Sequence, residues 1–128
     1  MVESLAAETE PLGLRTLLLE PGRFRTEISS SEKLGRSEVS QIPEYRQLSK
    51  FVLEYLADLH GKQQGDPAKL VDITVDLVRG EGVAVGKQLP LRLPIGQDSL
   101  DAVKGKMEEV RKSIEEWEEV TISTDFEV

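Results

Sequence analysis

The 128-residue sequence contains no cysteine, one histidine and few aromatic side chains. Without cysteine, neither a disulfide framework nor a thiolate metal site can form, and this fits a reducing compartment. A lone histidine, His60, is a poor metal ligand because zinc sites combine several nitrogen or sulfur donors. It also leaves no Ser-His-Asp or Cys-His set to assemble. The sequence therefore predicts no metal centre and no catalytic residues of these classes.

Long hydrophobic runs and excess positive charge are missing as well. No apolar segment approaches the roughly 20 residues that span a bilayer, and the N-terminus does not combine the basic and apolar regions of a signal peptide. The formal net charge of -8 disfavours nucleic acid, whose phosphates require cationic partners. We expect a single cytoplasmic domain over residues 1–128, without nucleic-acid or membrane partners.

The first strong structural pattern is an apolar run that stops at a turn. Residues 14–19 are mostly apolar, with four leucines, which favours a parallel strand covered on both faces. Pro21 and Gly22 end it. Residues 27–41 are rich in Ser, Glu, Lys and Gly and indicate a loop, which Thr26 could cap through its hydroxyl.

Two helices follow, each with a defined start. Pro43 suits a first helical position, and this helix should end near His60 and Gly61. Asp66 before Pro67 predicts the second start, because the carboxylate can accept from free N–H groups. The apolar positions of the first helix share one face at spacings of three and four: Tyr45, Leu48, Val52, Tyr55 and Leu59.

The last third combines a strand with a long helix. Apolar residues alternate with others over residues 89–93, and the missing N–H groups of Pro90 and Pro94 lie along one side, which predicts an edge strand. Apolar residues then repeat at spacings of three and four as a heptad seam: Leu100, Val103, Met107, Val110, Ile114 and Trp117. An amphipathic helix docked on its own domain is the simpler interpretation, and a helix–helix partner interface is the alternative, which Gly105 weakens.

The turn after the first strand carries a resemblance to a known family. The sequence LLLEPGRFRT over residues 17–26 resembles the cofactor-contacting turn of the short-chain dehydrogenases/reductases. Further stretches that are similar to segments of that family follow in the same order: residues 3–8 with 11–14, 61–69, 91–96 and 123–126. The resemblance covers nearly the whole chain.

This resemblance implies a fold, a cofactor and a site. The fold is α/β, the C-terminal half of a Rossmann-like, doubly wound parallel sheet with few strands and packed helices. Pro21, Gly22 and Thr26 correspond to residues that contact the nicotinamide of NAD or NADP, and Phe24 to a residue on the substrate side. The implied reaction is hydride transfer involving a small carbonyl or alcohol compound.

Two elements of such an enzyme are missing from the sequence. No Gly-rich turn that would bring backbone N–H groups to a pyrophosphate occurs. The family pairs a Tyr with a Lys four residues later, whereas Tyr45 and Tyr55 are followed at that distance by Ser49 and Leu59. Met1 falls just after the point where that pair would lie. We therefore expect a partial NAD(P)-binding domain that is inactive alone and is completed by a complementing chain or a homo-oligomer. The alternative is a non-catalytic remnant or interaction module.

Overall fold

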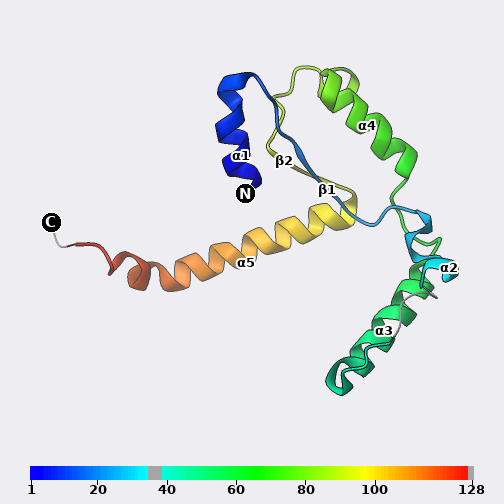
Figure 1. Ribbon diagram of the computed structural model, residues 1–128. Helices are drawn as coiled ribbons and strands as arrows, with labels where there is room; N and C mark the ends of the chain where they lie inside the picture. Colours follow the sequence, from blue (N-terminus) through cyan, green and yellow to red (C-terminus); the bar gives the residue numbers. More distant parts are fainter. Residues whose placement is uncertain (35–38, 127–128) are drawn as a thin grey trace.

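The computed structural model describes residues 1–34 and 39–126. Figure 1 shows the elements in the order α1 (Val2–Thr9), β1 (Leu18–Pro21), α2 (Ser31–Leu34), α3 (Pro43–Leu59), α4 (Pro67–Arg79), β2 (Arg92–Ile95) and α5 (Gln97–Ile122). Short 3₁₀ turns occur at Glu10–Leu12, Glu27–Ser29 and Gly82–Ala84. The predicted loop over residues 27–41 thus holds a 3₁₀ turn and α2, and its residues 35–38 lie outside the described residues.

The sheet consists of β1 and β2, paired in parallel from Leu18 with Arg92 to Pro21 with Ile95. The long crossover through α2, α3 and α4 permits this, since parallel neighbours need a connection of a dozen or more residues. The architecture is the expected α/β arrangement. The predicted bounds of the first strand were wrong, because pairing begins only at Leu18, whose N–H donates to the carbonyl of Leu91 at 2.8 Å.

Neither outer edge of this sheet carries another strand among residues 1–34 and 39–126. The carbonyls of Leu91 and Ile95 accept from β1, so Arg92 and Pro94 direct their backbone groups away from it. The missing N–H of Pro94 therefore lies on the outer side, which confirms the predicted edge strand.

The predicted limits of α3 and the predicted start of α4 are confirmed. Helix α3 begins at Pro43 and ends at Leu59, and α4 begins at Pro67. The Asp66 carboxylate accepts a hydrogen bond from the Ala68 N–H at 2.9 Å, which caps the start of α4. Gly80 ends α4 with a φ of 73°, a left-handed conformation that glycine adopts without a side-chain clash.

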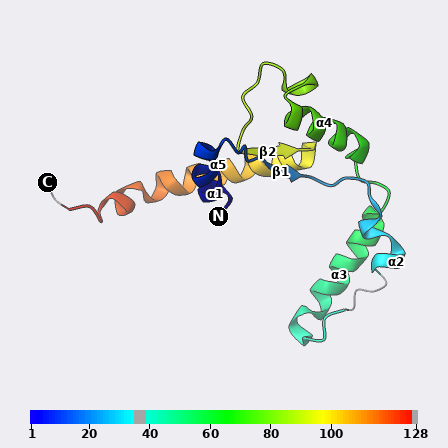
Figure 2. The same ribbon diagram turned by 45° about the horizontal axis from the view of Figure 1, so that its top comes forward.

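The hydrophobic core is small. Among the described residues, Leu77 and Ala84 are the buried apolar ones, and they border a hollow between α4 and β2. The apolar face of α3 is uncovered over most of its length, because the following four residues are exposed: Tyr45, Leu48, Val52 and Tyr55. Figures 1 and 2 show α3 extending away from the sheet. Periodicity shows that a face is apolar but does not identify what lies opposite it.

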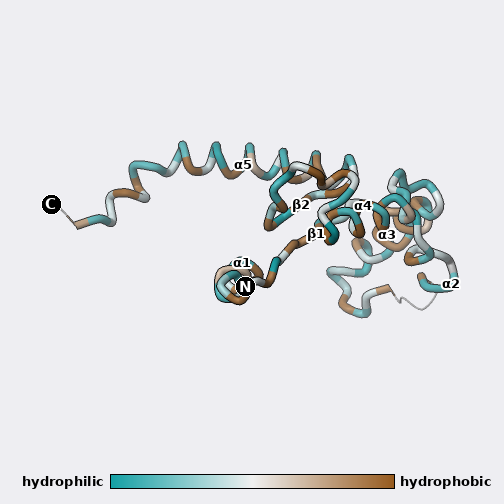
Figure 3. Tube along the Cα trace, turned by 90° about the horizontal axis from the view of Figure 1, so that it is seen from above, coloured by the Kyte–Doolittle hydropathy of each residue, from teal (hydrophilic) through white to brown (hydrophobic). Residues whose placement is uncertain are grey.

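Helix α5 also leaves the rest of the molecule. Its first turns contact β2, where Leu100 and Val103 are half-buried. Beyond them the helix projects freely, and in Figure 3 brown apolar positions recur along this part with no other element beside it. The prediction that α5 docks on its own domain therefore holds only for its first turns. Within the described chain, no helix is both long enough and apolar enough to cross a membrane.

Candidate functional site

The four residues singled out in the first turn line one hollow of about 350 Å³. Pro21, Gly22, Phe24 and Thr26 form one side of it as the chain leaves β1. The opposite side is mainly apolar and comes from α3, the segment after it and α4: Tyr55, Leu56, Leu59, Gln63 and Leu70. We call this hollow the turn pocket. It lies beyond the carboxyl end of β1, which is where ligands bind in open parallel sheets.

Gly22 is required at its position by the start of α5. Its N–H donates to the carbonyl of Ile95 at 2.8 Å, which brings the turn against the end of β2. A Cβ atom on Gly22 would lie 1.9 Å from Oδ1 of Asp98. The close approach of this carboxylate therefore gives a packing reason for glycine here.

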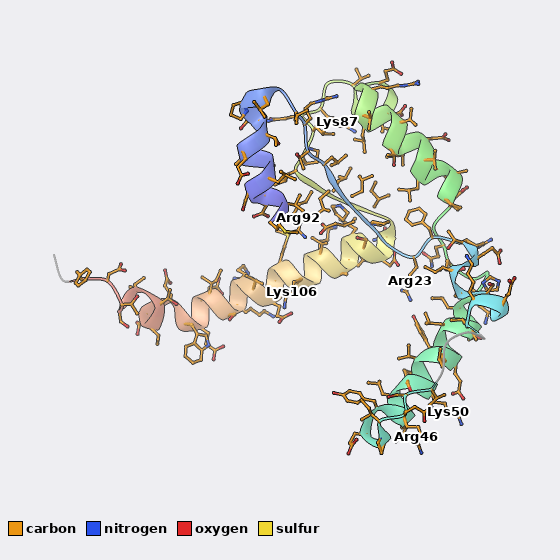
Figure 4. The ribbon with its side chains drawn as sticks, viewed as in Figure 1. Arg23, Arg46, Lys50, Lys87, Arg92 and Lys106 are labelled. Carbon is orange, nitrogen blue, oxygen red and sulfur yellow. The ribbon has the colours of Figure 1, made fainter. Side chains whose placement is uncertain are left out.

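Asp98 holds the turn through Arg23. Oδ2 of Asp98 accepts from the Arg23 backbone N–H at 2.8 Å and from Nε at 3.0 Å. These two hydrogen bonds, the backbone one first, lower the pKa of Asp98, although partial burial of the carboxylate opposes the shift. The Arg23 guanidinium also donates to the Tyr55 hydroxyl, and Figure 4 shows Arg23 at the junction of β1, α5 and α3. One side chain thus joins three elements.

The lowered pKa of Asp98 gives a prediction for Asp98→Asn. A depressed folded-state pKa contributes stability above the unfolded-state pKa of about 4, and this contribution is lost as the pH falls through the folded value. At pH 7 the variant should therefore melt about 3 °C below wild type. The difference should shrink as the pH falls below about 4, so it should be smaller at pH 3 than at pH 7. Thermal unfolding followed by circular dichroism at both pH values checks this, and an equal difference at both would contradict it.

A second clamp joins the turn to the segment after α3. Phe24 forms a parallel bridge with Gly65, in which the Arg25 N–H donates to the Gly65 carbonyl at 2.8 Å and the Gly65 N–H donates to the Arg23 carbonyl at 3.2 Å. The Arg25 guanidinium donates to the Gln63 carbonyl at 3.0 and 3.2 Å. Phe24 is half-buried and lines the turn pocket.

Polar groups close the floor of the pocket. Nε2 of Gln63 donates to Oγ of Ser29 at 3.1 Å, and both side chains are buried. Oγ of Ser29 lies 3.5 Å from Nδ1 of His60, which follows the last turn of α3. His60 thus has the structural surroundings expected near a helix end. No group of three or more His, Cys, Asp or Glu side chains in the described part of the chain could hold a metal ion.

The side chain of Thr26 forms no capping hydrogen bond in this fold. Thr26 is exposed and precedes the 3₁₀ turn at Glu27–Ser29. The interpretation that its hydroxyl caps the loop was therefore wrong. A hydroxyl both donates and accepts hydrogen bonds, so Thr26 offers the pocket a free polar group.

Three residues that shape this site were missed from the sequence: Asp98, Tyr55 and Gln63. An acidic residue in the first turn of a helix, just after Gly96, was a usable signal for Asp98, because helix N-termini favour negative charge. Tyr55 and Gln63 carried no local signal. Their roles depend on where α3 lies relative to β1.

Comparison with known proteins places this site in context. No protein-family model matches the chain. It is 33% identical over 96 residues to the uncharacterized oxidoreductase YusZ of Bacillus subtilis, a match covering 74% of this chain and 32% of that protein. It is 28% identical over 121 residues to the oxidoreductase BOA17 of Botryotinia fuckeliana, covering 94% of this chain and 40% of that protein.

A solved structure agrees with these relatives. The crystal structure of a short-chain dehydrogenase from Streptomyces avermitilis matches 98% of this chain with a TM-score of 0.67 and 30% sequence identity. The chain is related to the short-chain dehydrogenases. It spans about 42% of that solved chain, and a third to two-fifths of the two curated relatives. The turn pocket therefore belongs to a short-chain dehydrogenase fold of which this chain supplies a part.

Proposed function

We propose that the turn pocket receives the nicotinamide end of NAD or NADP in an oxidoreductase that acts on a carbonyl or alcohol compound. The observation that carries this proposal is the free hydroxyl of Thr26 beside Pro21 and Gly22, in an apolar hollow at the carboxyl end of a parallel sheet. The relationship to the short-chain dehydrogenases supports a nucleotide cofactor.

The chemistry of the pocket suits an uncharged ring with an amide. Its walls are mainly apolar side chains, which favour the faces of a ring. The hydroxyl of Thr26 can donate to the carboxamide oxygen or accept from its nitrogen. When bound, the cofactor would carry the hydride, and these residues would bind and orient its ring.

The phosphate end of the cofactor has no comparable receptor here. A helix N-terminus attracts phosphate through free N–H groups and the helix dipole. The N-terminus of α5, beside Gly22, already carries the Asp98 carboxylate, which is held by Arg23. A second anion at this point would meet like charge, so the pocket suits the ring and not the phosphates.

Neither tyrosine is followed by the lysine that the family pairs with it, so we assign no catalytic residue to this chain. The proposal is that the chain orients cofactor and substrate, with Phe24 on the substrate side, and that turnover requires groups from outside these 128 residues. The same proposal includes a complementing chain or a second copy as the source of these groups.

The test is binding of nicotinamide mononucleotide and the four dinucleotides, measured by saturation-transfer NMR on the 128-residue protein. Millimolar binding of the nicotinamide ring is expected, and Thr26→Ala should weaken it about fivefold, the value of one hydrogen bond near 1 kcal/mol. Because Thr26 is exposed and makes no side-chain hydrogen bond, stability should not change. Thr121→Ala, on α5 and remote from the pocket, is the matched control. A folded protein that shows no contact with the ring would overturn the proposal, as would equal effects of the two variants.

A further inference from the structure

The apolar seam of α5 extends beyond the first turns of the helix, which are the turns that contact the sheet. Leu100 and Val103 are half-buried against the sheet, but the next four members of the seam are exposed. Their exposed fractions are 67% for Met107, 45% for Val110, 62% for Ile114 and 56% for Trp117. Figures 1 and 3 show that the far part of the helix extends beyond the other described elements.

An apolar groove lies along the near half of the same seam. It is lined by Val103, Met107, Val110 and Ile114 from α5, and by Glu20 and Arg92 from the two strands. Lys106 and Arg111 complete its rim, and Figure 4 shows Arg92 and Lys106 at this place. The groove is therefore apolar at its base, and its charged rim consists of ion pairs, because Arg92 contacts Glu20, Lys106 contacts Glu109, and Arg111 contacts Glu108 and Glu115.

The charges beside the seam differ between the two halves of α5. In heptad terms, Lys104, Arg111 and Glu118 each follow a core position and Lys106 precedes one. Of these flanking residues, the ones in the near half are cationic, and Glu118 in the far half is acidic. The far half of one helix complements the near half of another.

This pattern discriminates between two ways of pairing α5 with a second copy. In a parallel pair, Lys106 would face Arg111 of the other helix twice, and no opposite-charge contact at the flanking positions offsets this, although Glu109 holds Lys106 and Glu108 and Glu115 hold Arg111 within each helix. In an antiparallel pair, Lys104 faces Glu118 of the other helix twice, and neither residue makes an ion pair within the described chain. The remaining like-charge contact, Arg111 with its own copy, is moderated because Glu108 and Glu115 already hold Arg111.

We propose that α5 is a dimerisation helix that packs antiparallel against α5 of a second copy of this chain. Met107 then lies opposite Trp117 of the second copy and Val110 opposite its Ile114, with the mirrored contacts at the other end. A thioether against an indole is a favourable contact. In this arrangement, the far half of each helix lies in the groove of the other copy, beside Arg92 and Lys106 of that copy. Gly105 lies on the outward face of the helix, where it does not interrupt the seam.

Sedimentation velocity of the 128-residue protein over a concentration series tests the pairing without any cofactor. The wild-type protein is expected to dimerise, and Ile114→Lys should weaken dimerisation more than about 30-fold while retaining the far-ultraviolet dichroism of the monomer. Val78→Lys is the matched control, because Val78 is 61% exposed on α4, away from the seam. A wild-type monomer would overturn the proposal and leave the seam to another occupant. Equal loss of dimer in both variants would overturn it as well.

A charge exchange tests the antiparallel direction. Lys104→Glu and Glu118→Lys each turn two attractive contacts into two repulsive ones, so each alone should weaken the dimer about tenfold. The double variant, or an equimolar mixture of the single variants, should restore wild-type affinity. If the exchange restores nothing, the antiparallel arrangement is wrong. The result is independent of Thr26 and of cofactor binding, so this proposal and the proposed function can fail separately.

Discussion

Gly65→Ala should lower the free energy of unfolding by about 2–3 kcal/mol, the upper range for overpacking a fitted site. A Cβ atom at this position would lie 2.7 Å from Cδ1 of Phe24 and 2.8 Å from the backbone carbonyl oxygen of Arg23. Neither neighbour can rotate away as a flexible side-chain tip can. The bridge between Phe24 and Gly65 must therefore open, and with it the wall of the turn pocket.

Urea unfolding gives the stability change, and hydrogen exchange of the Arg25 amide shows whether the bridge itself has opened. Arg25 donates to Gly65 at 2.8 Å, so its amide should lose protection in the variant. Gly105→Ala is the matched control, because a Cβ atom there meets nothing within 4 Å. It should stabilise the protein by up to about 1 kcal/mol through helix propensity. If both substitutions changed stability in the same direction, the packing argument would be refuted.

Leu77→Ala should destabilise the protein by about 2–3 kcal/mol, at the low end of the range for large-to-small core substitutions. Leu77 is 8% exposed and, with Ala84, forms the buried apolar part of the described fold. The low end applies because Leu77 borders an open hollow of about 280 Å³, into which its neighbours can relax.

Leu48→Ala is the same chemical change at a site with 56% exposure, and it should alter stability by less than about 0.5 kcal/mol. Chemical denaturation of the two variants side by side separates burial from composition. Similar losses at the two positions would mean that the exposed face of α3 is covered in solution.

Some parts of this fold could be predicted from local chemistry, and others could not. The start of α4 was predictable because Asp66 and Pro67 act within one turn of each other, and the hydrogen bond to Ala68 confirms it. The edge strand was predictable because a proline lacks its N–H whatever surrounds it. The register of β1 was not, since it depends on how far β2 reaches along it.

The site shows the same division. The turn at Pro21 and Gly22 is visible in the sequence as an apolar run that stops, and the resemblance to the short-chain dehydrogenases pointed to Thr26. The contacts that shape the pocket are long-range, from Asp98 to the turn and from Gln63 to Ser29. No short-range pattern records a contact between residues so far apart in the chain.

The sequence by itself determined the limits of α3, the start of α4, the parallel α/β class and the heptad period of α5. These depend on backbone chemistry and on residue spacing. Only the tertiary structure decided which apolar faces are covered. It exposed most of α3 and the far half of α5, buried Leu77, and left the Thr26 hydroxyl free beside Gly22. The physical reason is that a side chain is buried only when two surfaces pack together, whereas an apolar pattern in the sequence describes only one of those surfaces.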